Sequence, residues 1–137
     1  MIALRAATET DVAAVLAFWE AATAEPSSTD DPEAIDALLD RSPGALILAV
    51  HGDTIVGTVI AGWDGWRGTV YRLAVAPERR RQGIATKLVD EAERRLRGHG
   101  ARRMHLIVSR AGGGAAEDFW TSARYEPTDQ LRMVKDL

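Results

Sequence analysis

The sequence lacks several features that would restrict its function. It contains no cysteine, which excludes a disulfide framework, a cysteine-based zinc site and a thiol nucleophile. No apolar run approaches the roughly 20 residues needed to span a bilayer, and residues 1–5 lack the basic start and apolar stretch of a signal peptide. We therefore expect a cytoplasmic enzyme or binding protein that works away from membranes, as a monomer or a homodimer.

The composition is that of an ordinary globular protein. The chain has 137 residues, of which 46% are hydrophobic and 27% are charged, and this balance argues against disorder. A chain of this length buries roughly two-thirds of its unfolded surface, which suffices for one core rather than two. Because the sequence contains no internal repeat and no linker, residues 1–137 are expected to form a single domain.

Charge is divided unevenly along the chain, although the net charge is only −3. Residues 1–66 contain two basic and eleven acidic residues, a balance of −9, whereas residues 67–110 contain twelve and four, a balance of +8. Residues 111–137 contribute −2. This division indicates two differently charged partners or the two ends of one cleft, unless it is only solvated surface charge.

Hydrophobic periodicity predicts an α/β fold with the element order β-α-α-β-β-β-α-β-α-β. The expected strands are 2–5, 45–50, 54–62, 69–76, 103–108 and 131–136. The expected helices are 9–23, one from Pro32 to a stop at 42–44, 83–97, and a short one between glycines 112–114 and Ala123, with a loop at 25–31.

The strand at 103–108 is apolar enough to be buried on both faces. Together with the strand at 69–76 and the helix between them, it should form a right-handed parallel crossover. The sheet is therefore expected to be mixed.

The segment between the strand at 69–76 and the helix at 83–97 carries the most informative pattern. Three arginines at 79–81 precede Gly83 and Ala85 at the helix start. The first N–H groups of a helix lack intrahelical partners and carry partial positive charge, and glycine lets the backbone approach a ligand closely. The pattern predicts a cradle for a phosphate or diphosphate, or else a basic surface turn. It is neither a P-loop nor the dinucleotide fingerprint.

At these residues the sequence resembles the GNAT superfamily of N-acetyltransferases. The signature Gln/Arg-x-x-Gly-x-Gly/Ala is matched by residues 80–85 and the preceding Leu-Ala-Val-x-Pro phrase by residues 73–77. The order of elements also agrees over nearly the whole chain. The resemblance implies a mixed, mostly antiparallel sheet with a central parallel β-α-β crossover, and acetyl-CoA as cosubstrate.

The resemblance also assigns residues to acetyl-CoA. Backbone groups of one strand pair with the pantetheine arm, and loop amides bind the diphosphate with two auxiliary basic side chains. The strand residues are Leu73, Ala74 and Val75, the loop residues are Arg81, Gln82, Gly83, Ile84 and Ala85, and the auxiliary residues are Arg80 and Lys87.

In the reaction that the resemblance implies, an amine attacks the acetyl carbonyl directly, and a strand amide near residues 73–75 stabilises the tetrahedral oxyanion. That strand splays from its parallel neighbour and opens a slot for the thioester. The lack of cysteine supports direct transfer over a route through an acetylated cysteine.

The match is incomplete near the C-terminal end. The family pattern Asn-x-x-Ala-x-x-Phe-Tyr-x-x-x-Gly-Phe aligns with residues 113–125, where Ala116 and Phe119 agree but Gly113, Trp120 and Arg124 replace Asn, Tyr and Gly. In the family the tyrosine protonates the leaving thiolate, whereas an indole N–H donates a hydrogen bond without delivering a proton. Trp120 is therefore either a donor to the sulfur or a core residue. Because free thiols have a pKa of about 8.5, water can replace the missing acid or CoA can leave as the thiolate.

No side chain stands out as the general base. Glu20, Asp64 and Tyr71 are candidates because they lie on elements that flank the acceptor slot in the family. Each also has a simpler interpretation, as a helix-surface charge, a turn residue and a packed aromatic ring, respectively. Ordered water can also remove the proton of the amine.

The acidic N-terminal third shapes the acceptor side in the family, so its charge predicts a cationic primary amine, small or peptidyl, as the acceptor. Trp19, Trp63 and Trp66 are candidates to line the acceptor pocket, although some of them are expected in the core.

Two other classes of function can be set against the same residues. A non-catalytic acyl-CoA-binding or regulatory module is the alternative, because Gly113 and Trp120 depart from the family pattern. A nucleic-acid-binding protein is disfavoured by the acidic overall balance. His51, His99 and His105 lack metal-ligand spacing, so no metal is expected, and His105 should lie in the buried strand.

Overall fold

The structure is a computed structural model that describes residues 1–22, 26–109 and 113–137. The chain falls into two compact units, Met1–Leu106 and Ile107–Leu137. Within the described ranges, no helix is both long and apolar enough to cross a membrane. The predicted helix end at residue 23, the loop start at Glu25 and Gly112 of the glycine break lie outside the described residues.

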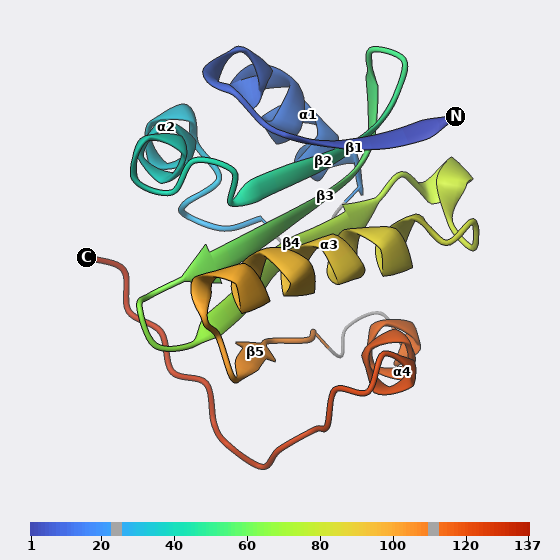
Figure 1. Ribbon diagram of the computed structural model, residues 1–137. Helices are drawn as coiled ribbons and strands as arrows, with labels where there is room; N and C mark the ends of the chain where they lie inside the picture. The colour runs from blue at the N-terminus through green and yellow to red at the C-terminus, as the bar shows by residue number, and fades with distance from the viewer. Residues whose placement is uncertain (23–25, 110–112) are drawn as a thin grey trace. The chain divides into compact units, whose positions relative to one another are not determined.

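The first unit is built on a five-stranded sheet in the order β1-β2-β3-β4-β5 (Figure 1). The strands are β1 (Ile2–Ala6), β2 (Leu46–His51), β3 (Thr54–Trp63), β4 (Gly68–Val75) and β5 (Met104–Leu106). The first three pairings are antiparallel, while β4 and β5 are parallel. This confirms the expected mixed, mostly antiparallel sheet with one parallel crossover.

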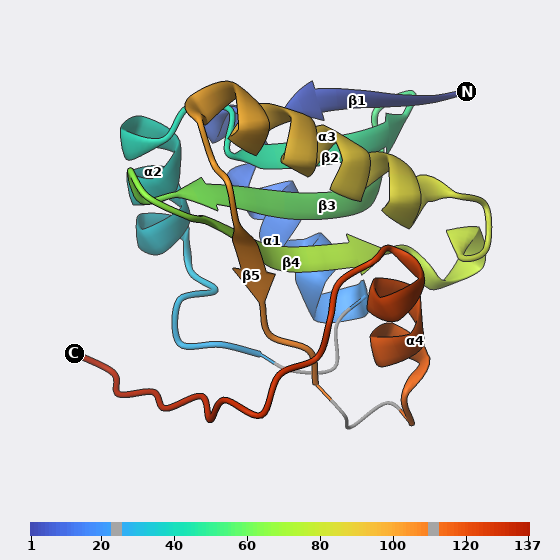
Figure 2. The ribbon, with the colours of Figure 1, turned by 60° about the horizontal axis from the view of Figure 1, so that its bottom comes forward.

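Helices cover both faces of this sheet (Figures 1 and 2). The helices α1 (Val12–Ala22) and α2 (Pro32–Arg41) lie on one face, and α3 (Ile84–His99), which connects β4 to β5, lies on the other. The predicted start of α2 is confirmed, because the Asp31 side chain accepts a hydrogen bond from the Ala34 N–H at 2.7 Å. The sheet is therefore the middle layer of three.

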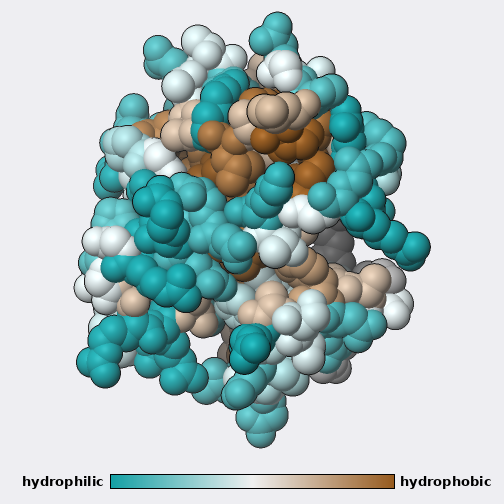
Figure 3. Space-filling model, turned by 45° about the vertical axis from the view of Figure 1, so that its right-hand side comes forward, coloured by the Kyte–Doolittle hydropathy of each residue, from teal (hydrophilic) through white to brown (hydrophobic). Residues whose placement is uncertain are grey.

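A hydrophobic core fills the space between the sheet and the helices α1 and α2. Its largest fully buried side chain is Trp19 of α1. The other buried members are Ala7, Val12, Val15, Ile35, Leu46, Leu48, Val50, Ile60 and Ala74. At the height of α1, β1 and β2, hydrophobic residues also reach the molecular surface, within a face that is otherwise largely hydrophilic (Figure 3).

On the opposite face, two glycines of the sheet allow α3 to pack closely. A Cβ added at Gly57 of β3 would lie 2.9 Å from Cδ1 of Leu88, and one added at Gly68 of β4 would lie 2.8 Å from Cδ1 of Leu96. Both leucines are fully buried. Because a side chain at either glycine would push the helix outward, these glycines fix the position of α3 against β3 and β4.

The strand β5 is shorter and less buried than its sequence predicts. It pairs with β4 over only three residues, Met104–Leu106. His105, expected in a buried strand, is exposed, and its Nε2 lies 3.2 Å from Oγ1 of Thr69. The prediction of burial on both faces is wrong, because exposure alternates along β5: Met104 and Leu106 are half-buried on one face, while His105 is exposed on the other.

The second unit contains one helix, α4 (Ala115–Ser122), among its described residues. The helix was predicted to end near Ala123, and this is confirmed. Trp120 is its buried residue, and its ring meets those of Phe119 and Tyr125 edge to face, with centroids 5.2 and 5.0 Å apart.

The predicted last strand at 131–136 is absent. These residues belong to no helix or strand, and Leu131, Met133 and Val134 are exposed. A strand needs a partner for its N–H and C=O groups, and no described residue pairs with this segment. The apolar residues of the segment therefore give a strand-like sequence without a sheet to join.

Candidate functional site

The strand β4 is interrupted by a β-bulge. Its pairing with β3 passes from Ile60↔Tyr71 to Thr58↔Ala74, so two residues of β4, Arg72 and Leu73, lie opposite one residue of β3. Arg72 has a φ of +52°, in the left-handed region that non-glycine residues rarely adopt. The bulge lies within the strand that was predicted to face the pantetheine arm.

The outer edge of β4 is open beyond Val70, just before the bulge, in the sense that no strand among the described residues pairs with it there. Pairing with β5 ends at Val70↔Leu106, and no other strand among the described residues pairs with that edge. The backbone of Leu73, Ala74 and Val75 therefore borders an interrupted sheet edge, where an extended ligand can form hydrogen bonds in place of a strand.

The chain leaves β4 through a short turn and enters α3 in a strained conformation. A 3₁₀ turn at Pro77–Arg79 is followed by Arg81 with a φ of +63° and by Gly83 with a φ of +81°. Gly83 is the N-cap of α3 and provides no side chain to cap the first turn. A Cβ added at Gly83 would meet no atom within 4 Å, so the space before the helix start is open.

Some side chains around this turn are buried or bound to other residues, and others are exposed to solvent. Ile84 is buried under the sheet, so only its backbone can serve a ligand. Arg79 donates from Nη2 to Nδ1 of His51 at 2.8 Å and is therefore tied to the β2–β3 turn. The exposed residues beside the helix start include Arg80, Arg81, Gln82 and Lys87, together with Glu78 and Thr86.

These features match an anionic ligand in their chemistry. Uncapped N–H groups at the start of a 16-residue helix attract negative charge, and exposed guanidinium and ammonium groups add charge-assisted donors. The absence of a Cβ at Gly83 leaves the approach to those N–H groups free. The residues present therefore fit a diphosphate such as that of acetyl-CoA.

A set of buried and half-buried polar contacts adjoins the bulge, and the predictions from sequence do not include it. Nε1 of Trp19 donates to Oγ1 of Thr58 at 2.9 Å, and that hydroxyl donates to the carbonyl oxygen of Arg72 at 2.8 Å. The Arg72 guanidinium forms an ion pair with Asp30 and lies 5.3 Å from the centre of the Trp19 ring. Its only sequence signal is a threonine and an arginine inside otherwise apolar strands.

The three candidate bases occupy different environments. Glu20 is exposed on α1, and Tyr71 of β4 is 54% exposed on the face that carries α1. Asp64 accepts hydrogen bonds from the N–H groups of Arg67 and Trp66 in the β3–β4 turn, and these bonds lower its pKa. Asp64 thus acts as a turn residue, and its lowered pKa makes it a weaker base.

The tryptophans named as pocket candidates also differ. Trp19 is buried in the core, and Trp63 stacks on His99 with ring centroids 5.8 Å apart. Trp66 is 71% exposed, with the guanidinium of Arg67 4.0 Å above its ring. Of the three, Trp66 has the most surface available to a ligand.

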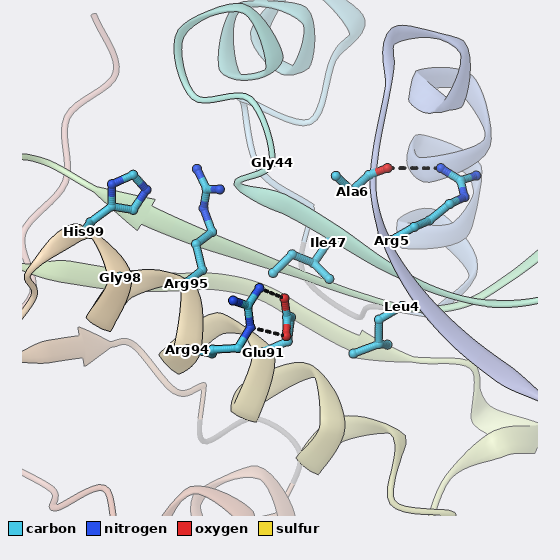
Figure 4. Close-up of a pocket in the computed structure, with 10 residues that line it drawn as sticks. All are labelled: Leu4, Arg5, Ala6, Gly44, Ile47, Glu91, Arg94, Arg95, Gly98 and His99. Atoms are coloured by element: carbon cyan, nitrogen blue, oxygen red, sulfur yellow. Dashed lines mark hydrogen bonds and ion pairs between the residues drawn. The ribbon is translucent and has the colours of Figure 1, made fainter.

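A separate cavity lies along the other end of α3 (Figure 4). It has a volume of about 440 Å³ and is lined by residues of β1, β2 and α3, including Arg5, Arg94, Arg95 and His99. Arg94 is paired with Glu91 in its wall, and Arg95 donates to the carbonyl oxygen of Pro43. Because the helix start at Gly83 does not line this cavity, it is distinct from the open turn described above.

Comparison with known proteins agrees with this geometry. Residues 12–123 match the family model described as "Acetyltransferase (GNAT) family". The chain is 32% identical over 127 residues to an acetyltransferase of Pectobacterium atrosepticum, covering 93% of this chain and 89% of that protein.

Solved structures share the fold at lower sequence identity. Ard1 from Thermoplasma volcanium superposes with a TM-score of 0.81 at 17% identity, covering 93% of this chain and 84% of that one. A protein described as a predicted acetyltransferase, from Clostridium acetobutylicum and solved with acetyl-CoA, superposes with a TM-score of 0.78 at 15% identity, covering 98% and 96%. With its family match and its curated relative, the chain belongs to the GNAT family and is an acetyltransferase.

Proposed function

We propose that this acetyltransferase moves the acetyl group of acetyl-CoA directly to a primary amine in a ternary complex. The observation that carries the proposal is the succession, along one chain segment, of a bulged strand with an open edge and a helix start with uncapped N–H groups. An extended thioester with a diphosphate at one end needs both features in that order. The family match crosses from the first unit into the second, so we infer one acetyltransferase domain over residues 1–137.

The diphosphate end is assigned to the turn before α3. The backbone N–H groups of Arg81, Gln82, Gly83, Ile84 and Ala85 bind the phosphate oxygens, and Arg80 and Lys87 supply additional positive charge. Supporting this assignment are the exposure of the basic side chains and the open space at Gly83.

The reacting end is assigned to the bulge. The backbone of Leu73, Ala74 and Val75 pairs with the pantetheine arm along the open edge of β4. The amine nitrogen attacks the carbonyl carbon, the oxyanion accepts a hydrogen bond from a strand N–H, and the C–S bond then breaks to release CoA as a thiolate. In this scheme Glu20, Tyr71 or ordered water accepts the proton of the amine. Trp120 donates a hydrogen bond to the sulfur, and water protonates the thiolate or CoA leaves as the thiolate.

The acceptor is assigned as a cationic amine. Residues 1–66 carry a balance of −9 and residues 67–110 a balance of +8, so opposite charges would draw the amine and the diphosphate to different parts of the molecule. An amine panel of cationic, neutral and anionic members, followed by thiol release, tests this assignment. Acetylation of neutral or anionic amines alone would contradict it, and binding of acetyl-CoA without any transfer would favour the non-catalytic alternative.

The cofactor assignment is tested with charge-reversal variants. Arg81→Glu and Gly83→Asp place a carboxylate at the proposed diphosphate site, so isothermal titration should give a sharply weaker affinity for acetyl-CoA in both. Arg102→Glu is the matched control, because it makes the same charge change at an exposed arginine beyond the other end of α3. If the affinity is unchanged in both test variants, the diphosphate lies elsewhere.

A further inference from the structure

The side chain of Thr58 is fully buried and connects α1 to the backbone of the β4 bulge. Its hydroxyl oxygen accepts a hydrogen bond from Nε1 of Trp19 at 2.9 Å. Its single hydroxyl proton is donated to the carbonyl oxygen of Arg72 at 2.8 Å. A side chain of β3 thus fixes this carbonyl, at the point where the register between β3 and β4 is interrupted.

The direction of the Arg72 carbonyl determines the direction of the next N–H group. The described peptide bonds are all trans, and in a planar trans peptide the C=O and N–H bonds point to opposite sides. Because the carbonyl of Arg72 points to Thr58 on β3, the N–H of Leu73 points away from β3. That is the side on which β4 lacks a neighbouring strand beyond Val70.

The backbone at Arg72 needs this support, because its φ of +52° is unfavourable for an L-residue. Such conformations persist where the surroundings enforce them. The ion pair with Asp30, the Trp19 ring below the guanidinium and the Thr58 hydroxyl hold the side chain and the carbonyl of this one residue. Contacts to the side chain and to the carbonyl of Arg72 therefore both stabilise the bulge.

We propose that Thr58 is a positioning residue for acetyl transfer, which aims the Leu73 N–H at the carbonyl oxygen of the thioester. Trp19 holds the hydroxyl in the orientation that this requires. Neither side chain touches the substrate, and both act through the Arg72–Leu73 peptide. The inference rests on the proposed function, and it names the one N–H group among residues 73–75 that serves as the oxyanion donor.

Two substitutions remove hydrogen bonds of this support, Thr58→Val at nearly constant volume and Trp19→Phe with some loss of buried volume. Thr58→Val replaces the hydroxyl by a methyl group, and Trp19→Phe removes the indole donor while keeping an aromatic ring. Thr58→Ser restores the hydroxyl and is the conservative rescue. Val15→Ala is the control for stability, because Val15 is fully buried in the same core, on α1, and is not part of these hydrogen bonds.

The kinetic readout is a split between kcat and acetyl-CoA affinity. Losing an oxyanion donor costs about 100-fold or more in kcat, so misdirecting it should lower kcat by roughly 10-fold to 100-fold in Thr58→Val. The dissociation constant for acetyl-CoA should stay within about twofold, because the helix start that binds the diphosphate is unchanged. Thr58→Ser should recover most of the activity, and Val15→Ala should lower the melting temperature while keeping kcat.

A second readout needs no acceptor amine. In the wild-type protein, the backbone amide resonance of Leu73 should shift between the complexes with CoA and with acetyl-CoA, since only the latter offers a carbonyl oxygen. Thr58→Val and Trp19→Phe should lose this difference, and Thr58→Ser should keep it. If Thr58→Val fails to fold, Trp19→Phe and Thr58→Ser carry both measurements.

The outcomes separate this inference from the proposed function. If folded Thr58→Val retains the wild-type kcat or the Leu73 response, the positioning role is wrong even though transfer occurs. An equal loss of kcat in Val15→Ala overturns it as well, because the effect is then one of stability. If the wild-type protein binds acetyl-CoA but acetylates no amine, the proposed function fails and with it the role of Thr58 in transfer, while the Leu73 response still shows whether Thr58 directs that N–H to the thioester. Absence of acetyl-CoA binding overturns both.

Discussion

Replacing Gly83 with alanine strains the backbone at the start of α3 without introducing a steric clash. Gly83 has a φ of +81°, and a Cβ there would meet no atom within 4 Å. The left-handed conformation costs an L-residue about 1–2 kcal/mol. The turn can relieve this strain by rotating the peptide units that carry the first N–H groups of the helix, and these are the groups assigned to the diphosphate.

If the bound state must restore the original turn, the strain reappears as lost affinity. A cost of about 1.4 kcal/mol corresponds to a tenfold change in the dissociation constant. Isothermal titration of Gly83→Ala with acetyl-CoA should therefore give an affinity roughly tenfold weaker than that of the wild type.

The matched control lies at the other end of the same helix. Gly100 has a φ of +100°, and a Cβ there would also meet no atom within 4 Å. Gly100→Ala should lower the melting temperature about as much as Gly83→Ala while leaving the affinity unchanged. Equal affinities in the two variants would refute the reasoning, because the helix start would then have no special role in binding.

Three further predictions concern stability. The hydrogen bond from Arg5 lowers the pKa of Asp11 to about 2, so this pair adds stability above the unfolded pKa of about 3.9 that is lost as the pH falls toward 2. Because Arg5 is half exposed and solvent weakens the ion pair, Asp11→Asn should lower the free energy of unfolding by only about 1–2 kcal/mol at pH 7. Urea denaturation should show this difference from the wild type nearly vanishing near pH 2. Gly57→Ala would bring a Cβ to 2.9 Å from Leu88 and 3.2 Å from a backbone oxygen, so thermal unfolding should report a loss of about 1–3 kcal/mol; an unchanged melting temperature would mean that α3 shifts freely. Asp31→Ala removes the cap of α2 and should cost about 1 kcal/mol in urea denaturation, with Asp31→Ser largely restoring it.

The sequence predicts the first four strands, the three longer helices and the turn before α3 because each has a local signal. Alternating or continuous apolar runs mark the strands, and Asp31 and Gly100 mark helix ends. The motif at residues 80–85 is also local, so its placement at the start of α3 follows from sequence alone.

The remaining features depend on contacts between distant residues. The bulge at Arg72 arises from pairing between β3 and β4 and from an ion pair with Asp30, 42 positions away. Thr58 reads as one more β-branched residue of a strand until its bond to Trp19 is known. The strand predicted at 131–136 is wrong for a related reason. An apolar pattern makes a strand only where a neighbouring strand pairs with it, and the sequence of the segment does not show whether such a partner is present.

The open edge of β4 is also a hazard for the protein. If this edge pairs with the pantetheine arm as proposed, its backbone groups are equally available to an extended segment of another polypeptide, which is how sheets add strands during aggregation. The ligand-free enzyme should therefore aggregate faster than the enzyme bound to acetyl-CoA. Saturation with acetyl-CoA during storage should slow the increase in light scattering. An edge that binds acetyl-CoA in this way would link the solubility of the protein to the supply of its substrate.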